Sequence, residues 1–439
     1  MVGSSAAATP RTVSPAPARG AAARARASVV PLWYLYTAAA ALVLFGTALI
    51  ALAPDARATT LTPHVLAVIH LATLGVLTTA IMGALWQLLP VILVVPAPAA
   101  WISRAHYPLW LVGVALLVAG FWSNQWPALA AGGSLVTLGA IAFAAVMLRT
   151  IVRAPRRPLS AYFIAAGLLY LVVVVLGGLT LAIDLQTSFL GDRLLRVLPA
   201  HLLLGFAGWG IGTVIGVSYK LAPMFALAHV AGERLGWWCF GLLQSGILVL
   251  ALALTAGWPQ AVGLAAGIAI LLALVLYAID TVRILRSRNK KVLEPTQWHA
   301  LAGIGYLLAC CAIALYDGLG DAGWWLDGRT ATGLGLLFLL GFIAQTIMGY
   351  LYKVVPFLVW NRRYAPLVGR QKVPVMRDLI RERTARLTFP LYNAGLICLL
   401  VAIWWSPDLI RPAAAIVAAA TWLFAANLLA VLRPIRKGT

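Results

Sequence analysis

The chain has 439 residues, of which 62% are hydrophobic and only 10% are charged. Soluble globular domains carry about 25% charged residues, so this composition excludes a solvated surface around a single core. The formal net charge of +21 comes from basic residues dispersed over the predicted loops, which argues against a nucleic-acid-binding patch. The class that remains is an integral membrane protein.

Apolar runs long enough to cross a bilayer recur along the whole chain. We expect about 12 transmembrane helices, at residues 30–53, 64–92, 106–124, 127–148, 161–184, 197–222, 236–256, 259–282, 297–316, 332–358, 388–405 and 412–432. The sequence therefore predicts an all-α membrane protein with a single transmembrane bundle over residues 29–435. Residues 1–28, rich in Ala, Pro, Ser and Arg, predict a disordered cytoplasmic tail.

Basic residues favour one side of the predicted bundle. With the N-terminus in the cytoplasm, all but five of the 33 lysines and arginines lie on the cytoplasmic side; the five are Arg57, Arg193, Arg196, Arg329 and Arg411. This positive-inside distribution predicts a multi-pass protein of the cell inner (cytoplasmic) membrane with both termini in the cytoplasm. The expected partner is the lipid bilayer, with anionic headgroups at the cytoplasmic face, and no nucleic acid.

Residues 360–387 are predicted to form a basic cytoplasmic loop. Within and just beyond it, residues 373–389 carry apolar side chains at helical spacing opposite several arginines, which predicts a helix lying on the headgroups. The alternative is a solvated basic linker.

An eight-residue pattern occurs three times, as "GALWQLLP" at 83–90, "GVSYKLAP" at 216–223 and "GYLYKVVP" at 349–356. Successive copies are separated by 133 positions both times, and a further glycine precedes each copy by eight residues. A fixed period indicates an internal repeat, with units at about 29–155, 156–292 and 293–435 and the helices in three pseudo-symmetric groups of four. The repeat residues are Gly75, Gly83, Trp86, Gln87, Pro90, Gly208, Gly216, Tyr219, Lys220, Pro223, Gly341, Gly349, Tyr352, Lys353 and Pro356.

Each copy lies at the cytoplasmic end of the second helix of its group, which favours a structural role. The aromatic residue at the fourth position fits an interfacial aromatic belt. Lys220 and Lys353 can extend to lipid headgroups, while Gln87 fills the same slot without a charge. The prolines can end or kink the helix where neighbours satisfy the freed carbonyls.

His70 and His201 lie in the outer parts of the second helices of the first two groups. They precede Pro90 and Pro223 by about 30 Å of helix at 1.5 Å per residue. Imidazole is a common ligand for haem iron and for copper, so both are candidate cofactor ligands. The alternative is a histidine hydrogen-bonded within the bundle. The other four histidines fall at span ends or loops and are expected at the interface: His64, His106, His229 and His299.

Twelve helices in groups of four, with "HLATLGVLTTAIMGALWQLLP" (70–90) on the second helix, resemble subunit I of the haem–copper oxidase superfamily. The cbb3-type branch is the nearest, and the NnrS-like membrane proteins are a looser relative. The resemblance covers about residues 30–435. It implies that His70 is an axial ligand of a low-spin haem, and that His201, by its helix, corresponds to a copper ligand.

Much of that family's ligand set is missing from this chain. The family's tenth helix carries a His-x-His pair, but the corresponding region reads "TGLGLLFLLG" (332–341). The paired copper histidines of the seventh helix are also absent from residues 236–257. The resemblance therefore implies at most one haem b, held by His70, and no complete oxygen-reducing centre; copper is not expected. Gln345 is the one polar side chain deep in the tenth helix that could occupy the second axial position.

These residues favour a divergent oxidase-subunit-I-like membrane protein that binds one haem through His70. It would act as an accessory, sensor or carrier in respiratory or nitrogen-oxide metabolism, with respiratory-complex subunits as partners. The alternative is a cofactor-free transporter or channel built on the same threefold bundle, and a third reading is a structural partner in a larger complex. An oxidase-like fold without the full ligand set leaves enzymatic activity open, and no catalytic residue is assigned.

Overall fold

The computed structural model describes residues 29–52, 62–228, 232–289, 292–320 and 328–433. Within these residues, twelve helices are long and apolar enough to cross a membrane, and each overlaps one predicted span. The prediction of an all-α, multi-pass membrane protein is confirmed. The predicted tail, residues 1–28, and His229 lie outside the described residues.

Nine of these spans in the described chain are single helices. They are α2 (Val29–Ala51), α5 (Ala100–Trp122), α6 (Trp126–Arg153), α7 (Leu159–Thr187), α10 (Arg234–Ala256), α11 (Gln260–Arg286), α12 (Pro295–Gly320), α15 (Glu382–Trp405) and α16 (Ile410–Ala430). The second helix of each group is longer and contains a π-helical stretch. These composite helices are α3–η1–α4 (Pro63–His70, Leu71–Thr78, Thr79–Leu93), α8–η3–α9 (Leu194–Leu203, Leu204–Ile211, Gly212–Ala226) and α13–η5–α14 (Gly328–Leu336, Leu337–Ala344, Gln345–Arg363).

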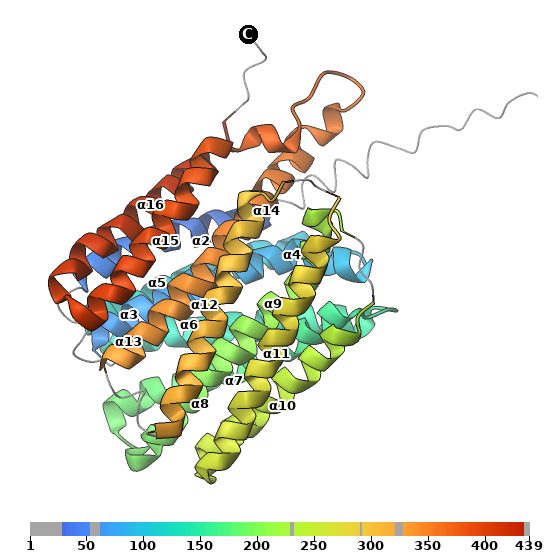
Figure 1. Cartoon of the computed structure of the whole chain (residues 1–439). Helices are drawn as coiled ribbons and strands as arrows, with labels where there is room; N and C mark the ends of the chain where they lie inside the picture. Colours follow the sequence, from blue (N-terminus) through green and yellow to red (C-terminus); the bar gives the residue numbers. More distant parts are fainter. Residues whose placement is uncertain (1–28, 53–61, 229–231, 290–291, 321–327, 434–439) are drawn as a thin grey trace, which may run out of the picture.

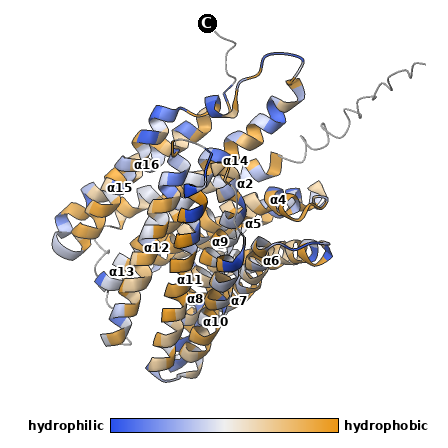
Figure 2. Cartoon of the chain, turned by 45° about the vertical axis from the view of Figure 1, so that its right-hand side comes forward, coloured by the Kyte–Doolittle hydropathy of each residue, from blue (hydrophilic) through white to orange (hydrophobic). Residues whose placement is uncertain are grey.

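The helices lie side by side in one bundle with their long axes roughly aligned (Figure 1). Hydrophobic residues run along the helices, while hydrophilic residues gather near the helix ends and loops (Figure 2). This arrangement suits a bilayer because helices satisfy their backbone hydrogen bonds internally where no water is present. We call the end of the bundle that carries Pro90, Pro223 and Pro356 the proline end, and the opposite end the histidine end. The membrane and the orientation of the termini stay predictions.

The same helix pairs pack together in each group. The first helix packs on the second (α2 on α4, α7 on α9, α12 on α14), and the third packs on the fourth (α5 on α6, α10 on α11, α15 on α16). Contacts between α6 and α7, α11 and α12, and α16 and α2 join the three groups in a ring. Pseudo-symmetry between the groups stays a prediction, which this pattern of neighbours supports.

The repeat glycines let the first two helices of each group approach closely. A Cβ atom at Gly208 would lie 2.6 Å from Cγ of Tyr170, and one at Gly216 would lie 2.6 Å from Cβ of Phe163. Those separations are too short for any side chain, so glycine is required for this packing.

The three π-helical stretches begin at residues 71, 204 and 337, and each is eight residues long. Their starts are therefore separated by the same 133 positions as the copies of the sequence motif. π-Helical turns are rare in proteins and are frequent at functional sites. The local geometry of the second helix thus recurs with the sequence period.

The prediction of an interfacial aromatic belt at the motif is wrong. Trp86 and Tyr352 are buried and Tyr219 is partly buried. Each ring packs on an aromatic ring of the fourth helix in its group, at centroid separations of 5.4, 6.0 and 5.0 Å: Trp86 on Phe143, Tyr219 on Tyr277, and Tyr352 on Phe424. The motif aromatics therefore hold each group together from inside.

Two further expectations about the motif are corrected. Lys353 forms an ion pair with Glu294, at the start of α12, and is not committed to lipid headgroups, whereas Lys220 is exposed as expected. The prolines do not end their helices, because Pro90, Pro223 and Pro356 all lie inside them. The first two helices instead end one turn later, at left-handed residues 94 and 227.

The predicted surface helix over residues 373–389 is also wrong. A short 3-10 turn covers Met376–Leu379, and α15 begins at Glu382 and continues into the bundle. The Glu382 carboxylate forms ion pairs with Arg377 at 2.8 Å and Arg386 at 2.5 Å. These pairs account for part of the basic charge in the predicted loop.

Candidate functional site

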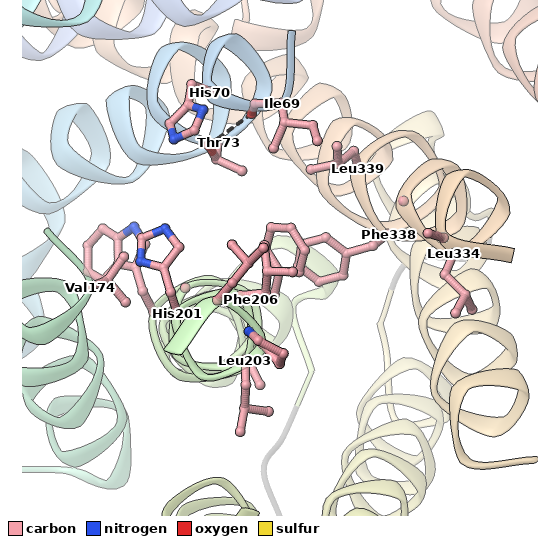
Figure 3. A pocket seen from close by; sticks show the side chains of 18 of the residues that line it. Ile69, His70, Thr73, Val174, His201, Leu203, Phe206, Leu334, Phe338 and Leu339 are labelled. Atoms are coloured by element: carbon pink, nitrogen blue, oxygen red, sulfur yellow. Dashed lines mark hydrogen bonds between the residues drawn. The ribbon is translucent and has the colours of Figure 1, made fainter. Parts of the chain in front are cut away.

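A cavity of about 1050 Å³ lies in the histidine half of the bundle. Its volume is at the upper end of the roughly 300–1,000 Å³ typical of cofactor and ligand sites. Leucine, valine, phenylalanine and glycine residues make up most of its wall, and both candidate ligands, His70 and His201, line it. Figure 3 shows the two imidazoles at the same cavity, on different helices, with Phe206 and Phe338 beside them.

The three π-helical stretches meet at the inner end of the cavity. Trp209 on η3 donates a hydrogen bond from Nε1 to Oγ1 of Thr78 on η1, at 2.9 Å. Phe206 on η3 packs against Phe338 on η5 with their ring centroids 4.5 Å apart. These contacts fix the helices that carry His70 and His201 relative to one another.

His70 is the last residue of α3, and its ring orientation is set by two contacts. Nδ1 donates a hydrogen bond to the carbonyl oxygen of Leu66 at 2.7 Å, because that carbonyl can only accept. The imidazole also stacks on Phe121, with centroids 4.8 Å apart. Nε2 makes no hydrogen bond within the described chain. Fixing the proton on Nδ1 leaves the Nε2 lone pair available to a ligand, which is the arrangement that metal-bound histidines use.

His201 lies on α8 and faces the cavity from the other helix. Its Nδ1 atom is buried and has no hydrogen-bond partner. The ring lies against α7, where a Cβ at Gly178 would come within 3.2 Å of Cε1. His70 and His201 are close enough to interact electrostatically. The structure therefore brings the two sequence-predicted ligands to one cavity.

Other polar residues of the cavity wall are already engaged. Asp184 accepts a hydrogen bond from the backbone N–H of Leu190 at 2.7 Å, and Cys310 donates to the carbonyl of Leu334 at 3.6 Å. Among the described residues, no group of three or more His, Cys, Asp or Glu side chains is placed to hold a metal ion. His70 and His201 are the only imidazoles among the described residues that line the cavity.

The third composite helix contributes hydrocarbon where the first two contribute imidazole. Leu336 lies two periods after His70, and Leu334 lies one period after His201. Both leucines line the cavity. The described part of the third group thus has no imidazole at this level of the cavity.

The expectation that Gln345 could reach the second axial position is wrong. Gln345 is fully buried but is not among the residues that line the cavity. Its carbonyl oxygen accepts from Nδ1 of His299, and its amide nitrogen donates to Oδ1 of Asn393 at 2.6 Å. The same oxygen of Asn393 accepts from the hydroxyl of Tyr306 at 2.9 Å. This polar cluster joins α12, α14 and α15.

Two histidines expected at the interface are buried inside the bundle. His299 belongs to the polar cluster, and its Nε2 atom has no partner. His106 donates from Nε2 to the carbonyl of Gly139 at 2.8 Å and accepts at Nδ1 from the hydroxyl of Tyr34 at 2.5 Å. His64 is exposed at a span entrance, as expected. Sequence position misled because the partners of His106 and His299 lie on other helices.

Models of known protein families give no match to this chain, and a search of curated protein sequences finds no significant relative. The chain is a 12-helix, all-α polytopic membrane protein within its described residues. The likeness to the haem–copper oxidases rests on the motif residues and on the helices that carry His70 and His201.

Proposed function

We propose that this membrane protein binds one haem in the cavity, with Nε2 of His70 as an axial ligand. The observation that carries the proposal is an imidazole whose proton is fixed on Nδ1 by Leu66 and whose Nε2 lone pair is left unused beside a large apolar cavity. A lone pair on a neutral imidazole is the form that ligates haem iron.

The rest of the cavity fits a haem in three respects. Its wall is mostly hydrocarbon, which suits the face of a macrocycle. Phe121 stacks on His70 and restricts rotation of the ring. A cation is also nearby, because Nη1 of Arg196 lies 3.1 Å from the Cβ position of Gly257, next to Trp258 of the cavity wall. A guanidinium there can pair with a propionate carboxylate.

Haem in such a site supplies one-electron chemistry or the binding of a diatomic gas. The protein's own residues orient the ring, exclude water and fix the proton on His70. These properties support a role as an accessory, sensor or carrier in respiratory or nitrogen-oxide metabolism. They do not support a complete oxygen-reducing centre, because the described cavity wall carries leucines at the third group's ligand positions.

The proposal is tested by purifying the protein in detergent from haem-replete cells and recording its absorption spectrum. We expect a Soret band in the wild type, its loss in His70→Ala, and its retention in His64→Ala. His64 is the matched control because it is an exposed histidine on the same helix, α3.

A colourless wild-type protein with no haem by chemical extraction would contradict the proposal. Solute flux in liposomes that is unaffected by His70→Ala would then favour the transporter alternative.

A further inference from the structure

We infer that His201 supplies the second axial ligand, so that one haem iron is held between α3 and α8. The inference rests on the proposed function and assigns His201 a role different from the copper ligation that its helix implies by resemblance. It predicts a single iron centre with two histidine ligands from different groups of the bundle.

The first support is the unsatisfied nitrogen of His201. Nδ1 is buried without a hydrogen-bond partner, and a buried polar atom left unpaired costs about 1–3 kcal/mol. A neutral imidazole keeps one nitrogen as an acceptor, so this side chain has a binding capacity that the described protein does not use. A ligand in the cavity accounts for it.

The second support is the shared position of the two histidines. They line one cavity and interact electrostatically, and Figure 3 shows both rings at the cavity between their helices. The hydrogen bond from Trp209 to Thr78 ties η3 to η1 directly beyond the two histidines. Ligands on rigid, mutually fixed helices keep the geometry that a metal site needs.

The third support is the lack of another free donor among the described residues of the cavity wall. Asp184 is bonded to the Leu190 amide, and Cys310 is bonded to the Leu334 carbonyl. Gln345 lies outside the wall and is engaged by His299 and Asn393. His201 is therefore the histidine best placed to be the partner of His70.

Two imidazole ligands determine what the site can do. They fill both axial positions, so no position stays open for oxygen, carbon monoxide or nitric oxide. Axial ligand identity also sets the reduction potential of a haem. Of the three roles named above, this coordination selects an electron carrier over a gas sensor.

The test uses haem-loaded, full-length protein and measures the spin state rather than activity. We expect the ferric wild type to be six-coordinate and low-spin by absorption and electron paramagnetic resonance, and the ferrous form to leave carbon monoxide unbound. His201→Ala is expected to give a five-coordinate, high-spin haem that binds carbon monoxide. His201→Met is a second variant that keeps a ligand, and it should stay low-spin with a shifted reduction potential. His64→Ala should match the wild type.

A haem-containing wild type that is high-spin and binds carbon monoxide would overturn this inference and leave the role of His70 standing. A His201→Ala protein with the wild-type spectrum would overturn it in the same way. A wild type without haem would overturn both the inference and the proposed function.

Discussion

The two ends of the three composite helices differ in what the repeat preserves. At the proline end, all three copies carry a glycine, an aromatic ring and a proline, and the three aromatic rings each pack on the fourth helix of their group. At the histidine end, the π-helical geometry recurs, but the side chains differ, with His70 and His201 in the first two copies and leucines in the third.

This difference separates architecture from chemistry. A residue that recurs in every copy and packs in the same way serves the bundle, which every group needs. A residue that breaks the repeat inside a cavity serves something that only that place needs. The histidines belong to the second class, and the third copy's polar character lies elsewhere, in the cluster of His299, Gln345 and Asn393.

The strongest test of the repeated architecture is Gly208→Ala. Its new Cβ would lie 2.6 Å from Cγ of Tyr170, and overpacking of this kind costs about 1–3 kcal/mol. We expect a lower unfolding temperature in detergent. Gly241→Ala is the control, because nothing lies within 4 Å of its Cβ position and alanine is the better helix former. Equal stability of Gly208→Ala and Gly241→Ala would show that the close approach is not required.

Gln345→Leu tests whether the third group's polar cluster is structural. The change leaves Nδ1–H of His299 without its acceptor, which costs about 1–3 kcal/mol for a buried donor. We expect lower stability and an unchanged haem spectrum. Gln244→Leu is the matched control, since Nε2 of Gln244 is buried without a partner and its loss should be tolerated. A changed spin state in Gln345→Leu would instead return Gln345 to the list of ligands.

Lys353→Gln is expected to have the smallest effect. The side chains of Lys353 and Glu294 are 22% and 27% exposed, and ion pairs near a solvated surface contribute about 0–1 kcal/mol. Glutamine already occupies this slot in the first copy, as Gln87. Unfolding in detergent, measured beside Lys220→Gln, should show a loss of less than about 1 kcal/mol. A collapse of the fold would make the ion pair a main support of the repeat.

The sequence predicts the spans well because a bilayer imposes a minimum apolar length on every helix. It also places His70 and His201 at similar depth, because a constant rise per residue converts spacing into distance. These two inferences were enough to bring both histidines to one cavity, where the structure has them.

Contacts between helices were beyond the reach of the sequence. His299 and Gln345 are 46 positions apart, and Gln345 and Asn393 are 48 apart, so no local pattern reveals their bonds. The burial of Trp86 and Tyr352 was missed for the same reason, because an aromatic residue near a helix end fits both a lipid interface and a helix–helix contact. The π-helical stretches have no sequence signal of their own beyond the 133-residue period.

The most direct test of the account is the amount of haem bound per chain at saturation. Purified protein, titrated with haem and separated from the excess, should hold one haem per chain in the wild type and in His64→Ala, and close to none in His70→Ala. A wild type that binds no haem, or that binds it equally well after His70→Ala, would contradict the claim that this cavity is a haem site built on His70.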